Sequence, residues 1–80
     1  MAFRDDLIMF IREDAGLSAS DFDDDTALFS DGLIDSFTMA SLMEFIEEKT
    51  GVEVGPADVT LDNLDSVSRI VRYVETVLAG

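Results

Sequence analysis

Apolar residues recur with the spacing of α-helices near both ends of this chain. In residues 3–14 they stand at i, i+4, i+7 and i+8, the spacing of one helix face. This first set comprises Phe3, Leu7, Phe10 and Ile11. The set near the other end is the most regular in the chain and comprises Val67, Ile70, Val71, Val74, Val77 and Leu78. The two sets predict amphipathic helices, the second of them starting close to Asp65 or Ser66.

Another helix is predicted in the middle of the chain, from Asp35 or Ser36 to about Thr50. Asp35 is a favourable N-cap, and Gly51 is a favourable stop after the last turn. The apolar face of this helix comprises Met39, Leu42, Met43 and Ile46, with Phe45 beside them. Residues near 57–63 predict a short helical turn. The elements together predict an all-α fold, a small antiparallel four-helix bundle with three long helices and one short one.

The segment 17–35, "LSASDFDDDTALFSDGLID", separates the first two predicted helices. Polar loops of this length are uncommon in compact domains and often have a function. Apolar residues within it are expected to attach it to the core; they are Phe22, Leu28, Phe29, Leu33 and Ile34. We expect residues 1–80 to form one domain, because a chain of this length supports a single modest core.

Charge narrows the possible partners. The chain has 18 acidic and 5 basic residues and a formal net charge of −13. Such a protein is repelled by nucleic acid and by anionic membrane surfaces, so we expect neither as a partner. It has no cysteine, which excludes disulfides and thiolate metal sites. No apolar run approaches the ~20 residues of a membrane span, and "MAFRDDLIMF" is not a signal peptide. We expect a soluble, cytoplasmic monomer that meets basic patches on its partners.

The acidic loop does not match a calcium site. Counted from Asp21, an EF-hand loop would need Gly at its sixth position, where Thr26 stands. It would need a bidentate Glu at its twelfth position, where Gly32 stands. A solvated acidic loop is the simpler interpretation, and we predict no metal ligands.

Ser36 lacks the neighbours that hydrolysis requires. The chain has no histidine to act as its base. Lys49 follows 13 positions later on the same predicted helix, roughly 20 Å away at 1.5 Å per residue. We therefore predict no catalytic residues and no enzyme activity. An ordinary serine at a helix start is one interpretation of Ser36, in an acidic helical interaction module without a prosthetic group. Phe37 falls off the apolar face, and an exposed aromatic residue beside a serine favours a docking feature instead.

At these residues the sequence resembles the acyl carrier protein family, over nearly the whole chain. The resemblance includes "LFSDGLIDSF", "FIEEKTGVEV" and "PADVTLDNLDSV", with the family's signature at Asp35, Ser36 and Phe37. It implies that Ser36 carries a 4′-phosphopantetheine arm, attached through a phosphodiester by a phosphopantetheinyl transferase that uses coenzyme A. It also implies that Asp35 supports recognition by that transferase. The thiol of the arm would hold acyl groups as thioesters.

The resemblance further implies that the second helix is the docking element for partner enzymes. Phe37 and Ala40 would make apolar contacts with these partners, while Glu47 and Glu48 would meet their Arg and Lys side chains. Glu44 lies near the same face. The implied partners are the transferase, an adenylating ligase or an acyltransferase, and a downstream synthase with a basic docking patch.

The predicted docking face departs from that of fatty-acid carriers. Those carriers usually have acidic residues where Thr38 and Ser41 stand and an apolar residue where Glu44 stands. The stretch "LFSDGLIDS" is more similar to D-alanyl carriers and to free-standing natural-product carriers. We therefore expect a short acyl or aminoacyl cargo in a specialised pathway of the polyketide or nonribosomal peptide type. A malonyl-type polyketide or fatty acid carrier is the alternative.

Overall fold

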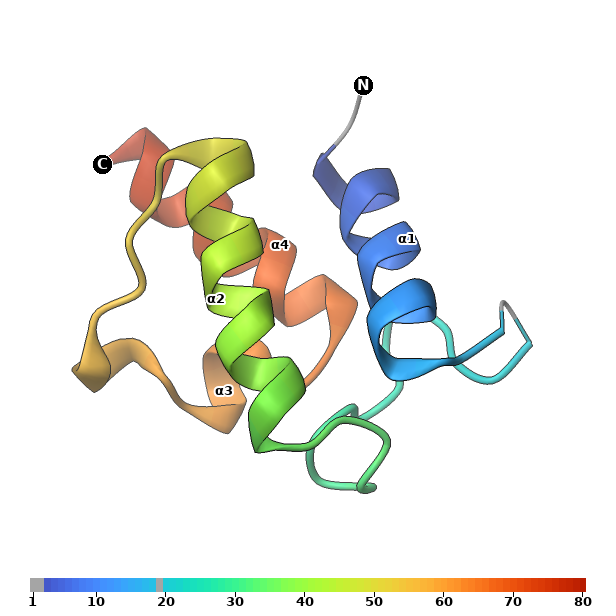
Figure 1. Ribbon diagram of the computed structural model, residues 1–80. Coiled ribbons are helices and arrows are strands. Elements are labelled where there is room, and N and C mark those ends of the chain that lie inside the picture. Colours follow the sequence, from blue (N-terminus) through green and yellow to red (C-terminus); the bar gives the residue numbers. More distant parts are fainter. Residues whose placement is uncertain (1–2, 19) are drawn as a thin grey trace.

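The computed structural model describes residues 3–18 and 20–80, and all its regular elements are helical (Figure 1). The three long helices are α1 (Phe3–Ala15), α2 (Ser36–Thr50) and α4 (Val67–Ala79). Two short elements lie between α2 and α4, the 3₁₀ turn η1 (Pro56–Asp58) and α3 (Leu61–Leu64). No strand occurs in the described ranges. The predicted all-α bundle of three long helices and one short one is confirmed, and η1 is an additional turn.

Local capping explains where the helices begin and end. The carboxylate of Asp35 accepts a hydrogen bond from the N–H of Thr38 at 3.0 Å, so it is the N-cap of α2. Gly51 closes α2 with φ of 76°, a left-handed conformation that costs other residues energy. Ser66 caps α4 by accepting from the N–H of Arg69 at 3.2 Å. The predicted boundaries of α2 are therefore confirmed at both ends.

The core lies where α1, α2 and α4 meet. In Figure 1, α1 and α2 run in opposite directions, and α4 crosses behind α2. Fully buried aliphatic side chains from the helices and the long loop fill this region; they include Leu7, Ile11, Leu28, Leu42, Ile46, Leu64, Val67 and Ile70. Phe45 of α2 adds stacked rings on Phe10 at a centroid distance of 4.6 Å and on Phe3 at 5.9 Å. These aromatic contacts join α1 to α2.

Two residues of the predicted apolar face of α4 are not in the core. Val77 and Leu78 are exposed, Leu78 by 62%, so their inclusion in that face was wrong. They lie in the last turn of α4, near the C-terminal end of the chain (Figure 1). Core burial on α4 ends at Val74. On α2, Met39 and Met43 are only half-buried.

The long loop is attached to the core as predicted. Leu28 and Ile34 are buried, while Phe22, Phe29 and Leu33 are half-buried and pack against the core. The N–H of Ile34 donates to the carbonyl of Leu28 at 3.0 Å, which closes the segment between the two buried anchors. The loop therefore reaches the start of α2 in a fixed conformation rather than as a free linker.

Candidate functional site

Ser36 is the first residue of α2, and its side chain is exposed. The first N–H groups of any α-helix have no partner within the helix, and the N-terminal end carries a partial positive charge. A phosphate attached to Ser36 would therefore lie where a helix favours an anion. The arrangement fits a phosphodiester on this serine.

Asp35 directly precedes Ser36 and has a structural task. Chiefly because its carboxylate accepts the hydrogen bond from the N–H of Thr38, the pKa of Asp35 lies below its ordinary value. Asp35 is therefore ionised at neutral pH, and it holds the first turn of α2 in place.

The five predicted docking residues share one face of α2. Their spacing of i, i+3, i+7, i+10 and i+11 gathers them on one side of a helix, and all five are exposed: Phe37, Ala40, Glu44, Glu47 and Glu48. Phe37 is 87% exposed, which confirms that it lies off the apolar face. We call these five residues the α2 docking face.

A shallow cleft of about 230 Å³ borders this face. Its walls come from α2 and from the segment that follows it; the lining residues are Ala40, Met43, Glu44, Glu47, Glu53 and Val54. The cleft thus has an apolar part and three carboxylates. Sequence analysis missed Glu53, because it lies outside α2 and only the fold brings it beside Glu44 and Glu47.

Thr38 does not belong to the docking face. Its side chain is only 9% exposed, and it lies on the same side of α2 as the buried Leu42 and Ile46 at i, i+4 and i+8 spacing. The prediction that Thr38 alters the surface met by partners was therefore wrong. Ser41 is half-buried, and Glu44 is exposed, so of the three departures from fatty-acid carriers only Ser41 and Glu44 contribute to the surface.

Asp65 is a second residue that sequence analysis missed. It lies between α3 and α4 and is only 8% exposed. Its carboxylate accepts hydrogen bonds from the N–H of Phe29 at 2.8 Å, the N–H of Ser30 at 3.0 Å and the hydroxyl of Ser30 at 2.6 Å. Burial alone would raise the pKa of Asp65, but the bonds from Ser30 and Phe29 and the charge of Arg69 hold that pKa below its ordinary value. An ionised carboxylate thus attaches the loop before α2 to the start of α4.

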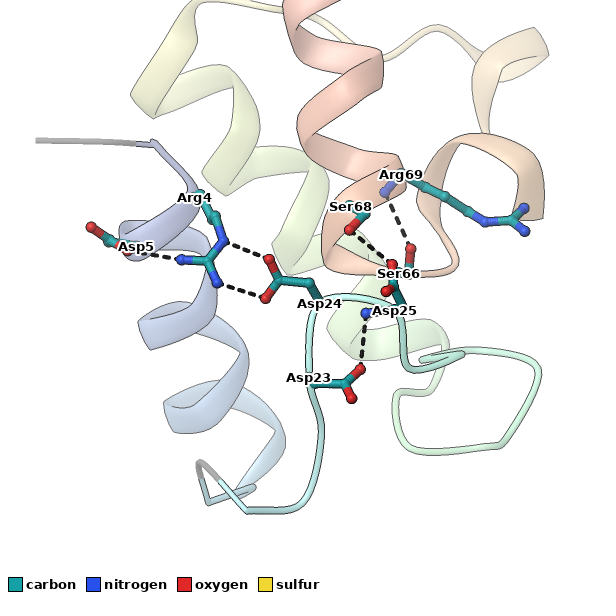
Figure 2. Close-up of polar contacts among 8 residues, drawn as sticks. All are labelled: Arg4, Asp5, Asp23, Asp24, Asp25, Ser66, Ser68 and Arg69. Carbon is teal, nitrogen blue, oxygen red and sulfur yellow. Dashed lines mark hydrogen bonds and ion pairs between the residues drawn. The ribbon is translucent and has the colours of Figure 1, made fainter.

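A further set of polar contacts attaches the first half of the loop (Figure 2). The guanidinium of Arg4 binds both carboxylate oxygens of Asp24 at 2.6 and 2.7 Å. The carbonyl of Asp24 accepts from the N–H of Ser68 at 2.9 Å, and the Ser68 hydroxyl donates to Asp25 at 3.1 Å. α1, the loop and α4 are therefore connected through adjacent acidic residues.

The acidic loop also organises itself. Asp23 accepts hydrogen bonds from the N–H of Asp25 and from the hydroxyl of Thr26, both at 2.9 Å. These bonds hold the pKa of Asp23 below its ordinary value, and the bond from Thr26 has the largest effect. Across residues 3–18 and 20–80, no group of three or more acidic, His or Cys side chains is arranged to hold a metal ion. In the same ranges, no helix is both long and apolar enough to cross a membrane.

Comparison with known proteins identifies the family. The family model described as "phosphopantetheine attachment site" matches residues 5–74. The chain belongs to this family of carrier proteins. A D-alanyl carrier protein of Staphylococcus saprophyticus is 32% identical over 75 residues, which cover 94% of this chain and 96% of that protein. An acyl carrier protein of Chlamydia caviae is 28% identical over 76 residues, which cover 95% of this chain and 96% of that protein.

Membership of the carrier protein family assigns the general role. The protein bears a covalent 4′-phosphopantetheine group and is a carrier rather than an enzyme. Carrier proteins interact in general with phosphopantetheinyl transferases and with synthetic enzymes. When bound, the group supplies the thiol that this chain, which has no cysteine, cannot provide.

Proposed function

We propose that Ser36 is the attachment site of 4′-phosphopantetheine and that residues 1–80 act as one carrier domain. One observation carries the proposal: Ser36 is an exposed serine at the first position of α2, directly after a capping aspartate. The hydroxyl oxygen of Ser36 forms the new bond to the phosphorus next to the pantetheine arm, the phosphoanhydride bond of coenzyme A breaks, and adenosine 3′,5′-bisphosphate leaves. Because the chain has no histidine and the carboxylate of Asp35 caps α2, the proposed base for the serine proton comes from the transferase or from solvent.

The α2 docking face is proposed to meet the partner enzymes. Phe37 exposes an aromatic ring one position after Ser36, which suits an apolar pocket beside the transferase or synthase active site. The carboxylates of Glu44, Glu47 and Glu48 make no hydrogen bond or ion pair with residues 3–18 or 20–80, and all three side chains are exposed. Their charges are available to Arg and Lys side chains of partners, which raises the association rate more than the final affinity.

The charge of the cleft beside α2 supports an aminoacyl cargo. An aminoacyl thioester carries an ammonium group, whereas a malonyl thioester carries a carboxylate. Glu44, Glu47 and Glu53 border the cleft and, with a chain charge of −13, attract the first cargo and repel the second. Similarity to a D-alanyl carrier protein supports the same choice. The proposed loading enzyme is an ATP-dependent adenylating ligase of a specialised pathway in the cytoplasm, where ATP and coenzyme A are supplied.

Intact mass tests the attachment site. The wild type and Ser36→Ala are incubated with coenzyme A and a broad-specificity phosphopantetheinyl transferase. We expect the wild type to gain one 4′-phosphopantetheine group and Ser36→Ala to gain none while keeping its helical circular dichroism. Ser41→Ala is the matched control, since Ser41 also lies on α2, and it should be modified like the wild type. Modification of the Ser36→Ala variant would refute the assignment.

Competition for the holo protein tests the cargo. The protein is offered to amino-acid-activating ligases, a malonyl transferase and a fatty acyl synthetase, and the loaded species are separated by mass. We expect aminoacyl loading to be fastest. Fast malonyl or fatty acyl loading with no aminoacyl product would leave the carrier role intact and support the malonyl-type alternative.

A further inference from the structure

Asp65 connects three parts of the fold through one residue. Its N–H donates to the carbonyl of Leu61 at 3.0 Å, so it closes α3. The next residue, Ser66, is the N-cap of α4. The carboxylate of Asp65 binds Phe29 and Ser30 of the long loop, which lie 36 and 35 positions earlier in the chain. Because this carboxylate is buried and accepts three hydrogen bonds, it holds the loop firmly against the start of α4.

Further hydrogen bonds connect Asp65 to the segment that leads into α2. The carbonyl of Asp65 accepts from the N–H of Leu28 at 2.6 Å, and the carbonyl of Leu28 accepts from the N–H of Ile34 at 3.0 Å. Ile34 directly precedes the capping residue Asp35 and then Ser36. Two main-chain hydrogen bonds and the peptide bonds from Ile34 to Ser36 therefore connect Asp65 to the proposed attachment site.

The segment between the two buried anchors depends on Asp65 for its shape. Leu28 and Ile34 are buried, whereas Ser30 and Gly32 between them are exposed. The N–H of Gly32 donates to the carbonyl of Phe29 at 3.1 Å, and Gly32 has φ of 77°. The turn thus begins at Phe29, one of the residues that Asp65 holds. Without the carboxylate, the N–H groups of Phe29 and Ser30 would lose their partner.

We propose that Asp65 is a positioning residue for the modification of Ser36. It holds segment 28–34 in one conformation beside the start of α2, so that a transferase meets a preformed surface. This inference rests on the proposed attachment at Ser36. Loss of the carboxylate releases the segment, and the transferase then has to order it on binding, which weakens binding of the carrier.

Steady-state kinetics of phosphopantetheine transfer tests the inference. The carrier is varied at saturating coenzyme A for the wild type, Asp65→Ala, Asp65→Asn and Ser30→Ala, at a temperature where circular dichroism shows all of them folded. We expect Asp65→Ala to raise KM for the carrier roughly threefold to tenfold, the equivalent of one net hydrogen bond, with kcat little changed. Asn keeps an acceptor oxygen, so Asp65→Asn should restore most of the KM. Ser30 is exposed, so Ser30→Ala should fold and should raise KM by a smaller factor. It replaces Asp65→Ala in the comparison if that variant does not fold.

Val74→Ala separates positioning from stability. Val74 is buried in the core formed with α4, so its truncation lowers the melting temperature while leaving the hydrogen bonds of Asp65 to Phe29 and Ser30 in place. We expect Val74→Ala to keep the wild-type KM. An equal rise in KM for Val74→Ala and Asp65→Ala, or wild-type KM in Asp65→Ala, would overturn the inference. Transfer to the wild type at a residue other than Ser36 would instead refute the proposed function, and this inference with it.

Discussion

The aspartates of the long loop and the glutamates of α2 have the same charge but opposite surroundings. Asp23 and Asp24 of the loop bind N–H, hydroxyl or guanidinium groups of the same chain, and Asp65, between α3 and α4, binds the loop itself. The carboxylates of Glu44 and Glu47 have no such partner in residues 3–18 and 20–80, and both residues line an open cleft. One set of charges therefore organises the fold, and the other is available to partner proteins.

Side-chain length explains this division. A short Asp side chain reaches nearby backbone N–H groups, which is why Asp favours turns and N-caps. Asp23 and Asp35 show this with donors two or three residues further along the chain. A Glu side chain on a helix extends into solvent, where a charge pair contributes little to stability. An acidic composition alone therefore does not indicate which carboxylates remain available to partners.

Removing the most buried of these carboxylates should have the largest effect. Asp65→Ala leaves two backbone N–H groups without their acceptor, so we expect it to lower the free energy of unfolding by about 2–4 kcal/mol. The melting temperature should fall by roughly 10 °C or more. Glu48→Ala, an exposed acidic control on α2, should leave the melting temperature unchanged. Urea unfolding measures the free energies of unfolding of both variants, and thermal unfolding measures their melting temperatures. Equal stability of Asp65→Ala and Glu48→Ala would contradict a structural role for the Asp65 carboxylate.

Acid should weaken the Asp65 attachment within a defined pH window. Because the pKa of Asp65 is lowered in the folded state, its stabilisation is fully present above the unfolded pKa and is lost as pH falls through the folded pKa. The groups facing it are Phe29, Ser30 and Arg69. The difference in unfolding free energy between the wild type and Asp65→Asn should be constant above about pH 5 and shrink below about pH 4.

The unfolding free energy of Asp65→Asn is subtracted from that of the wild type because acid also relieves the charge repulsion within a chain of net charge −13. That relief is nearly common to both proteins and cancels in the difference. A difference that stays constant from pH 6 to pH 3 would contradict the role given to the Asp65 carboxylate.

Salt should have the smallest effect and should be stabilising. Added salt screens the repulsion among exposed carboxylates, since the Debye length falls from about 10 Å at 0.1 M to about 3 Å at 1 M. It also weakens the exposed pair between Arg4 and Asp24, which is a minor opposing effect. We expect a rise of a few degrees in the melting temperature, measured in sodium chloride. A melting temperature independent of ionic strength would mean that self-repulsion is unimportant.

The helices of this protein could be predicted from sequence because their signals are local. Asp35 and Gly51 determine the ends of α2 through bonds to residues only a few positions away. Burial was less predictable. Thr38 is polar yet shares a helix face with Leu42, and Leu78 is apolar yet lies in the last, exposed turn of α4.

The site was only partly predictable for a related reason. Ser36 and Phe37 could be proposed from the sequence because a signature and a position off the apolar face are local features. Asp65 could not, because its partners lie about 35 positions away, and an Asp before a Ser at a helix start predicts only a cap. Glu53 likewise lines the cleft beside the α2 docking face only through the packing of the segment after α2.

Phosphopantetheine transfer at two salt concentrations tests most directly whether the α2 glutamates dock. We compare kcat/KM for the wild type, for Glu47→Lys/Glu48→Lys, and for Asp14→Lys/Glu75→Lys, which makes the same charge change at exposed positions on α1 and α4. At low salt the α2 variant should be several-fold slower than the wild type, and its rate should no longer depend on salt. The control should keep most of the wild-type rate and most of its salt dependence. Equal rates and equal salt dependence in the two variants would contradict docking through α2.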